Sequence, residues 1–218
     1  MPDQAAPPAP APPPRTVPPH TVPPDAAPAP AVPPHTVPTH TVPASARLEH
    51  TVLATVLGTP IGPLSLLAQG GRLIAGGFTA DPAVMRARLA VPLRALPLEH
   101  ADPADLPWLA TPVAGYFGGD LRALDAIPVY QPGPPSRQRL WAALRAVPPG
   151  RTVSYTQLAA QAGNPRAPRA AGAACAFNLI APVVPCHRAL RSDGTLGGYY
   201  YGLDRKTWLL RHEGARPA

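Results

Sequence analysis

Proline is unevenly distributed along this chain, and its distribution limits where a folded core can form. The first 45 residues hold 17 of the 36 prolines in the 218-residue chain, and the unit His-Thr-Val-Pro recurs there. Such a segment buries too little apolar surface to offset the entropy lost on ordering. We therefore expect a disordered, polyproline-like tail over residues 1–46. The remaining ~170 residues are enough for one compact unit or two small domains.

The proline-rich segment does not resemble a targeting sequence. Its histidines, His20, His35 and His40, recur with the proline repeat. We therefore interpret them as part of a drifting sequence repeat rather than as a metal site. The segment has neither the basic start nor the apolar run of a signal peptide. No stretch of the chain approaches the roughly 20 apolar residues that span a membrane. With two cysteines in all, a disulfide framework is not expected, and we predict a cytoplasmic protein.

Residues 47–132 show the pattern of a small mixed α/β domain. Three antiparallel strands are predicted over 50–57, 64–68 and 72–78. The stretch Gly58–Pro63 between the first two lacks the lysine and spacing of a phosphate loop, so a hairpin is preferred. Helices are predicted over 83–89 and 108–117. A proline-rich stretch at 131–135 marks the boundary with a second domain.

Residues 133–216 are predicted to be mostly helical, with helices over 136–146, 154–162 and 167–177. Ser154 and Gln157 form a capping-box pattern at the start of the second helix. Six residues of the third helix, Ala170–Ala174 and Ala176, are alanine or glycine. Its composition fits a tightly packed helix and a helix thin enough to enter a DNA groove equally well.

The positive charge of the chain lies almost entirely in its last third. Residues 136–218 hold twelve Lys/Arg and three Asp/Glu, a net charge of +9, whereas residues 47–135 hold six and seven, a net charge of −1. Eleven of those twelve cations are arginine, which suits bidentate contacts to phosphate. Because the excess of positive charge is confined to this one segment, we predict a nucleic-acid partner.

Cys186 stands in the run Val183-Val184-Pro185-Cys186-His187-Arg188. The valines and proline predict a buried strand that stops abruptly, with the thiol at a strand-to-loop corner. A nucleophilic cysteine must be deprotonated, and His187 with the carboxylate of Glu213 supplies the groups for that step. A packing role is the alternative for any single cysteine, and we assign it to Cys175.

This run resembles the Pro-Cys-His-Arg signature of the O6-alkylguanine-DNA alkyltransferases (methylated-DNA–protein-cysteine methyltransferases). Further matches lie at Ser154–Ala159, Gly163–Arg166, Arg169–Ala173, Gly202–Lys206 and Trp208–Gly214. The resemblance is strong over about 136–214, weaker over 48–135 and absent before that. It implies an α+β fold with a ribonuclease-H-like N-terminal domain (47–132) and a winged-helix-like, helix-turn-helix C-terminal domain (133–216).

The resemblance also implies a function. Such a protein repairs O6-alkylguanine in double-stranded DNA by moving the alkyl group onto its own cysteine, once per molecule, with O4-alkylthymine as a second candidate substrate. It acts as a monomer, without a cofactor or metal. The implied catalytic residues are Cys186, His187, Glu213 and Asn178. The implied DNA contacts are Arg169, Tyr155, Ala170, Gly172 and Ala173. The implied substrate pocket comprises Tyr199, Tyr200, Ala189, Ala181 and Trp208.

Three rival classes are weighed against this prediction. Alkyltransferase-like proteins bind damaged DNA without repairing it, but those members lack the cysteine that is present here. A cysteine hydrolase needs the same Cys-His pair, but neither the basic segment nor the small-residue helix. The family's transcription regulators carry an additional cysteine-rich zinc module, and no cysteine precedes Cys175.

The chain also departs from the family pattern. Ser136-Arg137 stands where many relatives have Phe-Gln, and Leu179 and Ala181 occupy positions of two loop prolines. Pro168 lies early in the recognition helix, and Tyr201 replaces a frequent glycine. We expect these changes to affect affinity and alkyl-group tolerance while leaving the chemistry in place.

Overall fold

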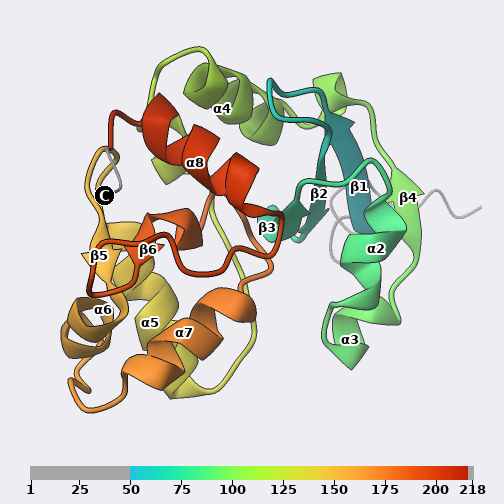
Figure 1. The fold of residues 1–218 in the computed structure, drawn as a ribbon. Coiled ribbons are helices and arrows are strands. Elements are labelled where there is room, and N and C mark those ends of the chain that lie inside the picture. Colours follow the sequence, from blue (N-terminus) through green and yellow to red (C-terminus); the bar gives the residue numbers. More distant parts are fainter. Residues whose placement is uncertain (1–49, 216–218) are drawn as a thin grey trace, which may run out of the picture. The chain divides into compact units, whose positions relative to one another are not determined.

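A computed structural model of the chain describes residues 50–215 (Figure 1). The expected tail over 1–46, its three histidines and the last three residues lie outside the described residues. Within 50–215 the fold is mixed α/β, as predicted. No helix of this part of the chain is long and apolar enough to cross a membrane.

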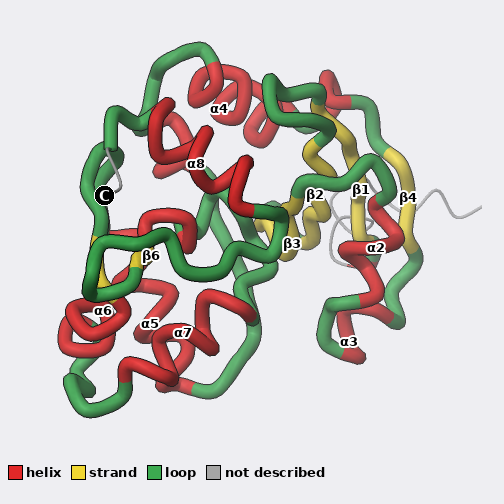
Figure 2. Tube along the Cα trace, in the orientation of Figure 1, coloured by secondary structure: helices red, strands yellow, loops and turns green. Residues whose placement is uncertain are grey.

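The first part of the fold is a four-stranded sheet with the order β3-β2-β1-β4 (Figure 2). The three predicted antiparallel strands are confirmed as β1 (Val52–Leu57), β2 (Leu64–Gln69) and β3 (Arg72–Gly77), and the stretch Gly58–Pro63 is a hairpin connection. The sequence did not predict β4 (Leu98–His100), which pairs parallel with β1. It has only three residues, too few for an alternating pattern to stand out.

Three helices belong to the same part of the chain, and two of them were predicted. They are α2 (Pro82–Ala87), the unpredicted single turn α3 (Val91–Arg94) and α4 (Pro107–Phe117), with short 3-10 turns η1 (Pro103–Asp105) and η2 (Ala123–Ala126) on either side of α4. The Asp81 side chain caps α2 by accepting a 2.8 Å hydrogen bond from the backbone N–H of Ala83. Leu109, Val113 and Tyr116 form the buried face of α4, at the spacing of one helix side.

Four helices dominate the second part: α5 (Pro135–Ala146), α6 (Tyr155–Gln161), α7 (Pro168–Ala176) and α8 (Leu203–His212). The capping box is confirmed, because Ser154 Oγ accepts from the Gln157 N–H at 3.1 Å and Gln157 Oε1 accepts from the Ser154 N–H at 2.8 Å. Pro168 is the first residue of α7, a position where the missing N–H removes no helical bond. A parallel pair, β5 (Val153–Ser154) and β6 (Ala189–Leu190), joins the start of α6 to the segment after the cysteine.

The prediction of a strand ending at Pro185 was wrong. Residues 181–184 form a turn, and Cys186 opens the 3-10 turn η3 (Cys186–Arg188). The Asn178 side chain holds this turn, since its amide donates to the Val184 carbonyl at 2.8 Å and its oxygen accepts from the Ile180 N–H at 3.1 Å. Pro182 and Pro185 have no N–H to give to a strand ladder, so the valines are buried in a turn instead.

The two parts share one hydrophobic core. Its buried members include Leu66 from the sheet, Leu109 from α4, Trp141 from α5 and Leu209 from α8. The edge of β3 also bonds to the segment after α7, because the Gly76 N–H donates to the Leu179 carbonyl at 2.7 Å. The described residues therefore place side chains from the sheet part next to the cysteine turn.

Candidate active site

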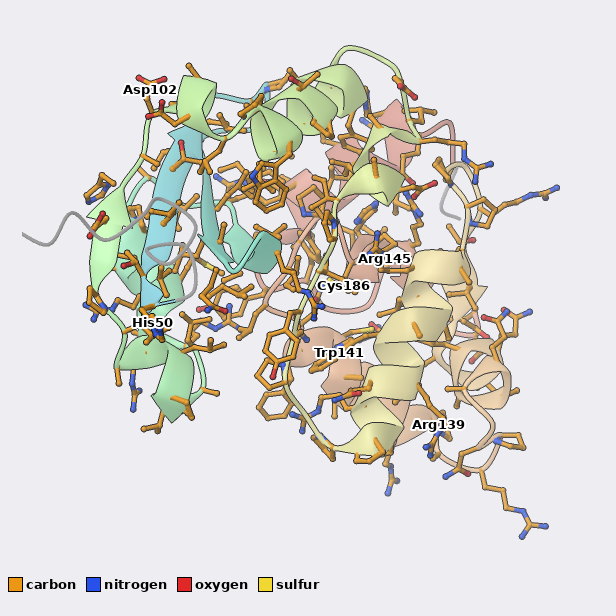
Figure 3. All side chains as sticks on the ribbon, turned by 180° about the vertical axis from the view of Figure 1, so that it is seen from behind. His50, Asp102, Arg139, Trp141, Arg145 and Cys186 are labelled. Atoms are coloured by element: carbon orange, nitrogen blue, oxygen red, sulfur yellow. The ribbon has the colours of Figure 1, made fainter. Side chains whose placement is uncertain are left out.

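Cys186 lies at one wall of a cavity of about 270 Å³ and is only 7% exposed. Figure 3 shows it in the interior, between the sheet part and α5. The Asn178 amide donates to its sulfur at 3.2 Å. Burial raises the pKa of the thiol, while the Asn178 hydrogen bond and the charge of Lys206 act in the opposite direction without cancelling it. The resting group is therefore a protonated thiol.

His187 follows directly and is completely buried. Its Nε2 lies 2.9 Å from Oε1 of Glu213, and burial lowers the pKa of the imidazole despite that carboxylate. A neutral ring that donates from Nε2 to the carboxylate leaves its Nδ1 lone pair as an acceptor; this tautomer is assigned from the hydrogen-bond network. Nδ1 is buried and has no hydrogen-bond partner among residues 50–215. The ring of the residue that follows Cys186 is thus held by Glu213 with one nitrogen left to accept a proton.

The Glu213 carboxylate is fixed by three further donors. Arg188 donates from Nε to Oε2 and from Nη2 to Oε1, each at 2.8 Å, and the Tyr116 hydroxyl donates to Oε1 at 2.8 Å. Burial alone would raise the pKa of Glu213, but the hydrogen bonds and charges of His187 and Arg188 outweigh it and hold that pKa well below its usual range. The carboxylate is therefore ionised, and its charge is balanced by Arg188.

Sequence reasoning did not assign Tyr116, Arg188 or Lys206 to the site. Tyr116 comes from α4, far away in the chain, so no local pattern pointed to it. Arg188 was noted only as the last residue of the Pro-Cys-His-Arg motif and was given no role. Lys206 had a usable signal, because it is the only lysine in the chain.

Lys206 organises the loop that closes the cavity. Its ammonium donates to the Ala189 carbonyl at 2.7 Å and also to the Leu196 carbonyl. Burial lowers its pKa to about 8, although the neighbouring cysteines act in the opposite direction. The cation thus fixes the backbone on both sides of the turn over residues 191–195 and places positive charge near the thiol.

Five of the residues expected in the substrate pocket or at DNA are found around the cavity or beside it. The cavity is lined by Tyr155, Gly172, Cys175, Ala176, Cys186, Gly198, Tyr199 and Tyr200. Ala189 is buried next to it, with its carbonyl on Lys206. Ala181 and Trp208 do not line it: the Ala181 N–H bonds to the Gly76 carbonyl at 3.0 Å, and the Trp208 ring stacks on His212. Cys175, expected to be a packing residue, has a wall position in the cavity.

The exposed side of α7 is made of small residues. Ala171 and Ala174 are buried, whereas Arg169, Ala170 and Ala173 are exposed, and a methyl group added at Gly172 would meet nothing within 4 Å. Trp141 holds the helix from behind by donating to the Ala174 carbonyl at 2.9 Å. The helix therefore presents a low ridge with an arginine at its start, next to the cavity mouth.

Comparisons with known proteins agree with these features. Residues 135–215 match the family described as "6-O-methylguanine DNA methyltransferase, DNA binding domain". The chain is 40% identical over 164 residues to the methylated-DNA–protein-cysteine methyltransferase of Salmonella typhimurium, covering 75% of this chain and 96% of that one. The same enzyme of Homo sapiens is 49% identical over 89 residues, covering 41% of this chain and 43% of that one.

Solved structures agree as well. The fold is similar to that of the Mycobacterium tuberculosis O6-methylguanine methyltransferase, with a TM-score of 0.61 at 31% identity over 77% of this chain and 96% of that one. A structure of the Mycobacterium tuberculosis protein in complex with DNA has a TM-score of 0.61 at 30% identity, covering 75% of this chain and 92% of that one.

Proposed function

The chain belongs to the methylated-DNA–protein-cysteine methyltransferase family, and we propose that Cys186 is its alkyl acceptor. The protein repairs DNA by direct transfer of the alkyl group from O6-alkylguanine to its own cysteine. The observation that carries the assignment is the position of Cys186 on the cavity wall, bonded to Asn178 and followed by the buried His187–Glu213 pair. Cys175 lies in the same cavity, but it is followed by Ala176 instead of an imidazole.

In the proposed mechanism, His187 accepts the thiol proton at Nδ1 through a bridging water. Glu213 stabilises the imidazolium that results. The thiolate attacks the alkyl carbon, so a sulfur–carbon bond forms as the carbon–O6 bond breaks and its electron pair goes to guanine. The departing guanine takes up a proton. The proton that His187 took from the thiol balances the one that guanine gains. Burial raises the pKa of the phenols of Tyr155 and Tyr199 in the cavity, so both stay protonated and can donate hydrogen bonds to the departing base.

The guanine must leave the duplex stack before it reaches this cavity, at a cost of about a few kcal/mol. We assign α7 as the helix that enters the DNA groove, with Arg169 filling the space of the extruded base. The small residues Ala170, Gly172 and Ala173 support this role, because larger side chains there would keep the helix away from the bases. We assign Tyr155, which lines the cavity, to a contact with the target nucleotide.

The organisation of the whole chain is proposed on the same basis. Residues 47–132 form a ribonuclease-H-like domain and residues 133–216 a winged-helix domain. The family match over 135–215 supports the bounds proposed for the winged-helix domain. We propose a cytoplasmic monomer that needs neither metal nor cofactor.

The alternative of lesion binding without transfer is tested by stoichiometry. Duplex DNA containing O6-methylguanine is incubated with increasing amounts of protein. The repaired fraction should rise linearly and saturate at one methyl per protein molecule. Tight binding of the lesion without any gain of repaired guanine would instead place the protein among the non-repairing members.

A further inference from the structure

A second cavity, of about 390 Å³, lies at the C-terminal end of α7 and is larger than the one at Cys186. It is formed between the C-terminal end of α2, the start of α5 and the C-terminal end of α7. Its lining residues are Ile74, Arg88, Gln131, Arg137, Trp141 and Phe177, together with smaller neighbours. The proposed transfer reaction uses none of them.

Two guanidinium groups give this cavity its charge. Arg88 and Arg137 both line it, and neither forms an ion pair with a carboxylate anywhere in residues 50–215. No acidic side chain is among the lining residues. Two uncompensated arginines facing one concave space favour an anion, and the planar fork of each group matches phosphate oxygens.

The same cavity has flat apolar surfaces and an unused hydrogen-bond donor. Arg137 lies over the Phe177 ring with 4.3 Å to the ring centroid, and Phe177 is 56% exposed at the mouth. The Gln131 amide accepts from the Leu179 N–H through Oε1, whereas its Nε2 is buried with no hydrogen-bond partner in the described part of the chain. Aromatic rings with a free amide suit a planar, polar-edged ring such as a nucleobase.

The two cavities are adjacent. Ala176 of α7 lines both of them, and Arg88 of the second cavity lies over the ring of Tyr200, which lines the first, at 4.0 Å. A DNA strand that places one nucleotide at Cys186 therefore passes close to the mouth of the second cavity.

We propose that this second cavity is an accessory subsite that binds one phosphate-bearing nucleotide of a DNA strand, with Arg88 and Arg137 on the phosphate and Phe177 and Gln131 on the base. The transfer steps assigned to Cys186, His187 and Glu213 use none of these four side chains, so either assignment can fail without the other. Its ligand class is a nucleotide rather than phosphate alone, because the charged and the aromatic surfaces line one space.

The experiment monitors the indole N–H resonance of Trp141 by NMR, since this side chain lines the cavity and points to a different side of α5 from Arg139 (Figure 3). The probes are thymidine 5′-monophosphate, thymidine and inorganic phosphate, and then the single strand (dT)4. Thymine avoids competition for a guanine pocket. The monophosphate should shift the Trp141 resonance at lower concentration than thymidine or phosphate, and (dT)4 at lower concentration still.

Variants distinguish specific binding in this cavity from non-specific attraction of the nucleotide to positive charge. Arg88→Gln and Arg137→Gln should each weaken monophosphate binding by about tenfold, the usual effect of losing a hydrogen bond to a charged group. Arg139→Gln removes the same charge from the same helix outside this cavity and should change binding less than about twofold. Arg137→Gln should keep the wild-type rate with free O6-benzylguanine, which also shows that the variant is folded.

Three results would overturn the proposal. Equal weakening by Arg139→Gln would show non-specific attraction. Loss of monophosphate binding after Cys186 has been benzylated would place the nucleotide in the first cavity. A Trp141 shift with the monophosphate and none with (dT)4 would exclude a DNA strand as the ligand.

Discussion

The hydroxyl of Tyr116 donates a 2.8 Å hydrogen bond to Oε1 of Glu213, the same oxygen that lies 2.9 Å from Nε2 of His187. Tyr116 belongs to α4, outside the segment matched by the family's DNA-binding domain. The carboxylate that orients the proposed base is thus itself positioned from the N-terminal part of the fold. This contact gives that part a direct link to the chemistry, in addition to its packing in the core.

Tyr116→Phe should lower the free energy of unfolding by about 1 to 2 kcal/mol, because the buried carboxylate loses one donor. The rate with O6-benzylguanine should fall less than tenfold, since Arg188 still holds Glu213. A carboxylate with fewer donors attracts the imidazolium more strongly, so the acid limb of the rate should move to higher pH. Tyr130→Phe, at a position 43% exposed, is the matched control and should change none of these. An unchanged pH profile in Tyr116→Phe would contradict the link.

The rate should also report the lowered pKa of His187 directly. The proposed base is the neutral imidazole, and burial lowers its pKa below 6.5. Transfer from O6-benzylguanine should therefore be nearly constant from pH 8 down to 6.5 and fall only below the lowered pKa. Glu213 stays ionised over this range and adds no second step, because its pKa lies below the usual 4.5. A midpoint above 6.5, or the same acid limb in His187→Gln, would exclude His187 as the titrating base.

Much of the fold could be predicted from local sequence patterns. Apolar runs bounded by turn residues, the Ser154 cap and the helical patterns over α4 and α5 are properties of neighbouring residues, and the elements predicted from them were confirmed. The turn before Cys186 was mistaken for a strand because Val183 and Val184 are apolar and β-branched. Their conformation is decided by the Asn178 side chain, and no local pattern shows that its amide bonds forward to Val184.

The site was predictable only in part, because contacts between residues distant in the sequence leave no local pattern. The motif containing Cys186 and His187 is contiguous, and the resemblance supplied Asn178 and Glu213. Tyr116 reaches Glu213 across 97 residues of sequence, and such a contact arises from how α4 packs on α8. The resemblance also led to Trp208 as a pocket residue, whereas its ring stacks on His212.

Arg169 separates base extrusion from chemistry. If its side chain fills the gap left by the flipped guanine, Arg169→Ala should slow repair of duplex DNA by about tenfold or more while changing the rate with free O6-benzylguanine little. Glu213→Gln should slow both substrates, since it alters the base at His187. The measurement is the single-turnover rate on each substrate. Equal losses on both for Arg169→Ala would assign that residue to the fold or the pocket.

Salt should weaken DNA binding steeply. Because the net charge of +9 is confined to 136–218, affinity for duplex DNA should fall by about tenfold or more between 50 and 200 mM salt. Deletion of residues 1–45 should leave the affinity, its salt dependence and the transfer rate within about twofold. A large loss on deletion would show that the proline-rich segment takes part in binding.

The central claim is that Cys186 accepts the alkyl group. Because Cys175 lines the same cavity, it serves as an internal control. The protein is incubated with duplex DNA containing O6-methylguanine, digested, and its cysteine peptides are measured by mass spectrometry. The added methyl should be found on Cys186 alone, and Cys186→Ala should bind the DNA yet acquire no methyl. Methyl on Cys175, or transfer by Cys186→Ala, would contradict the assignment.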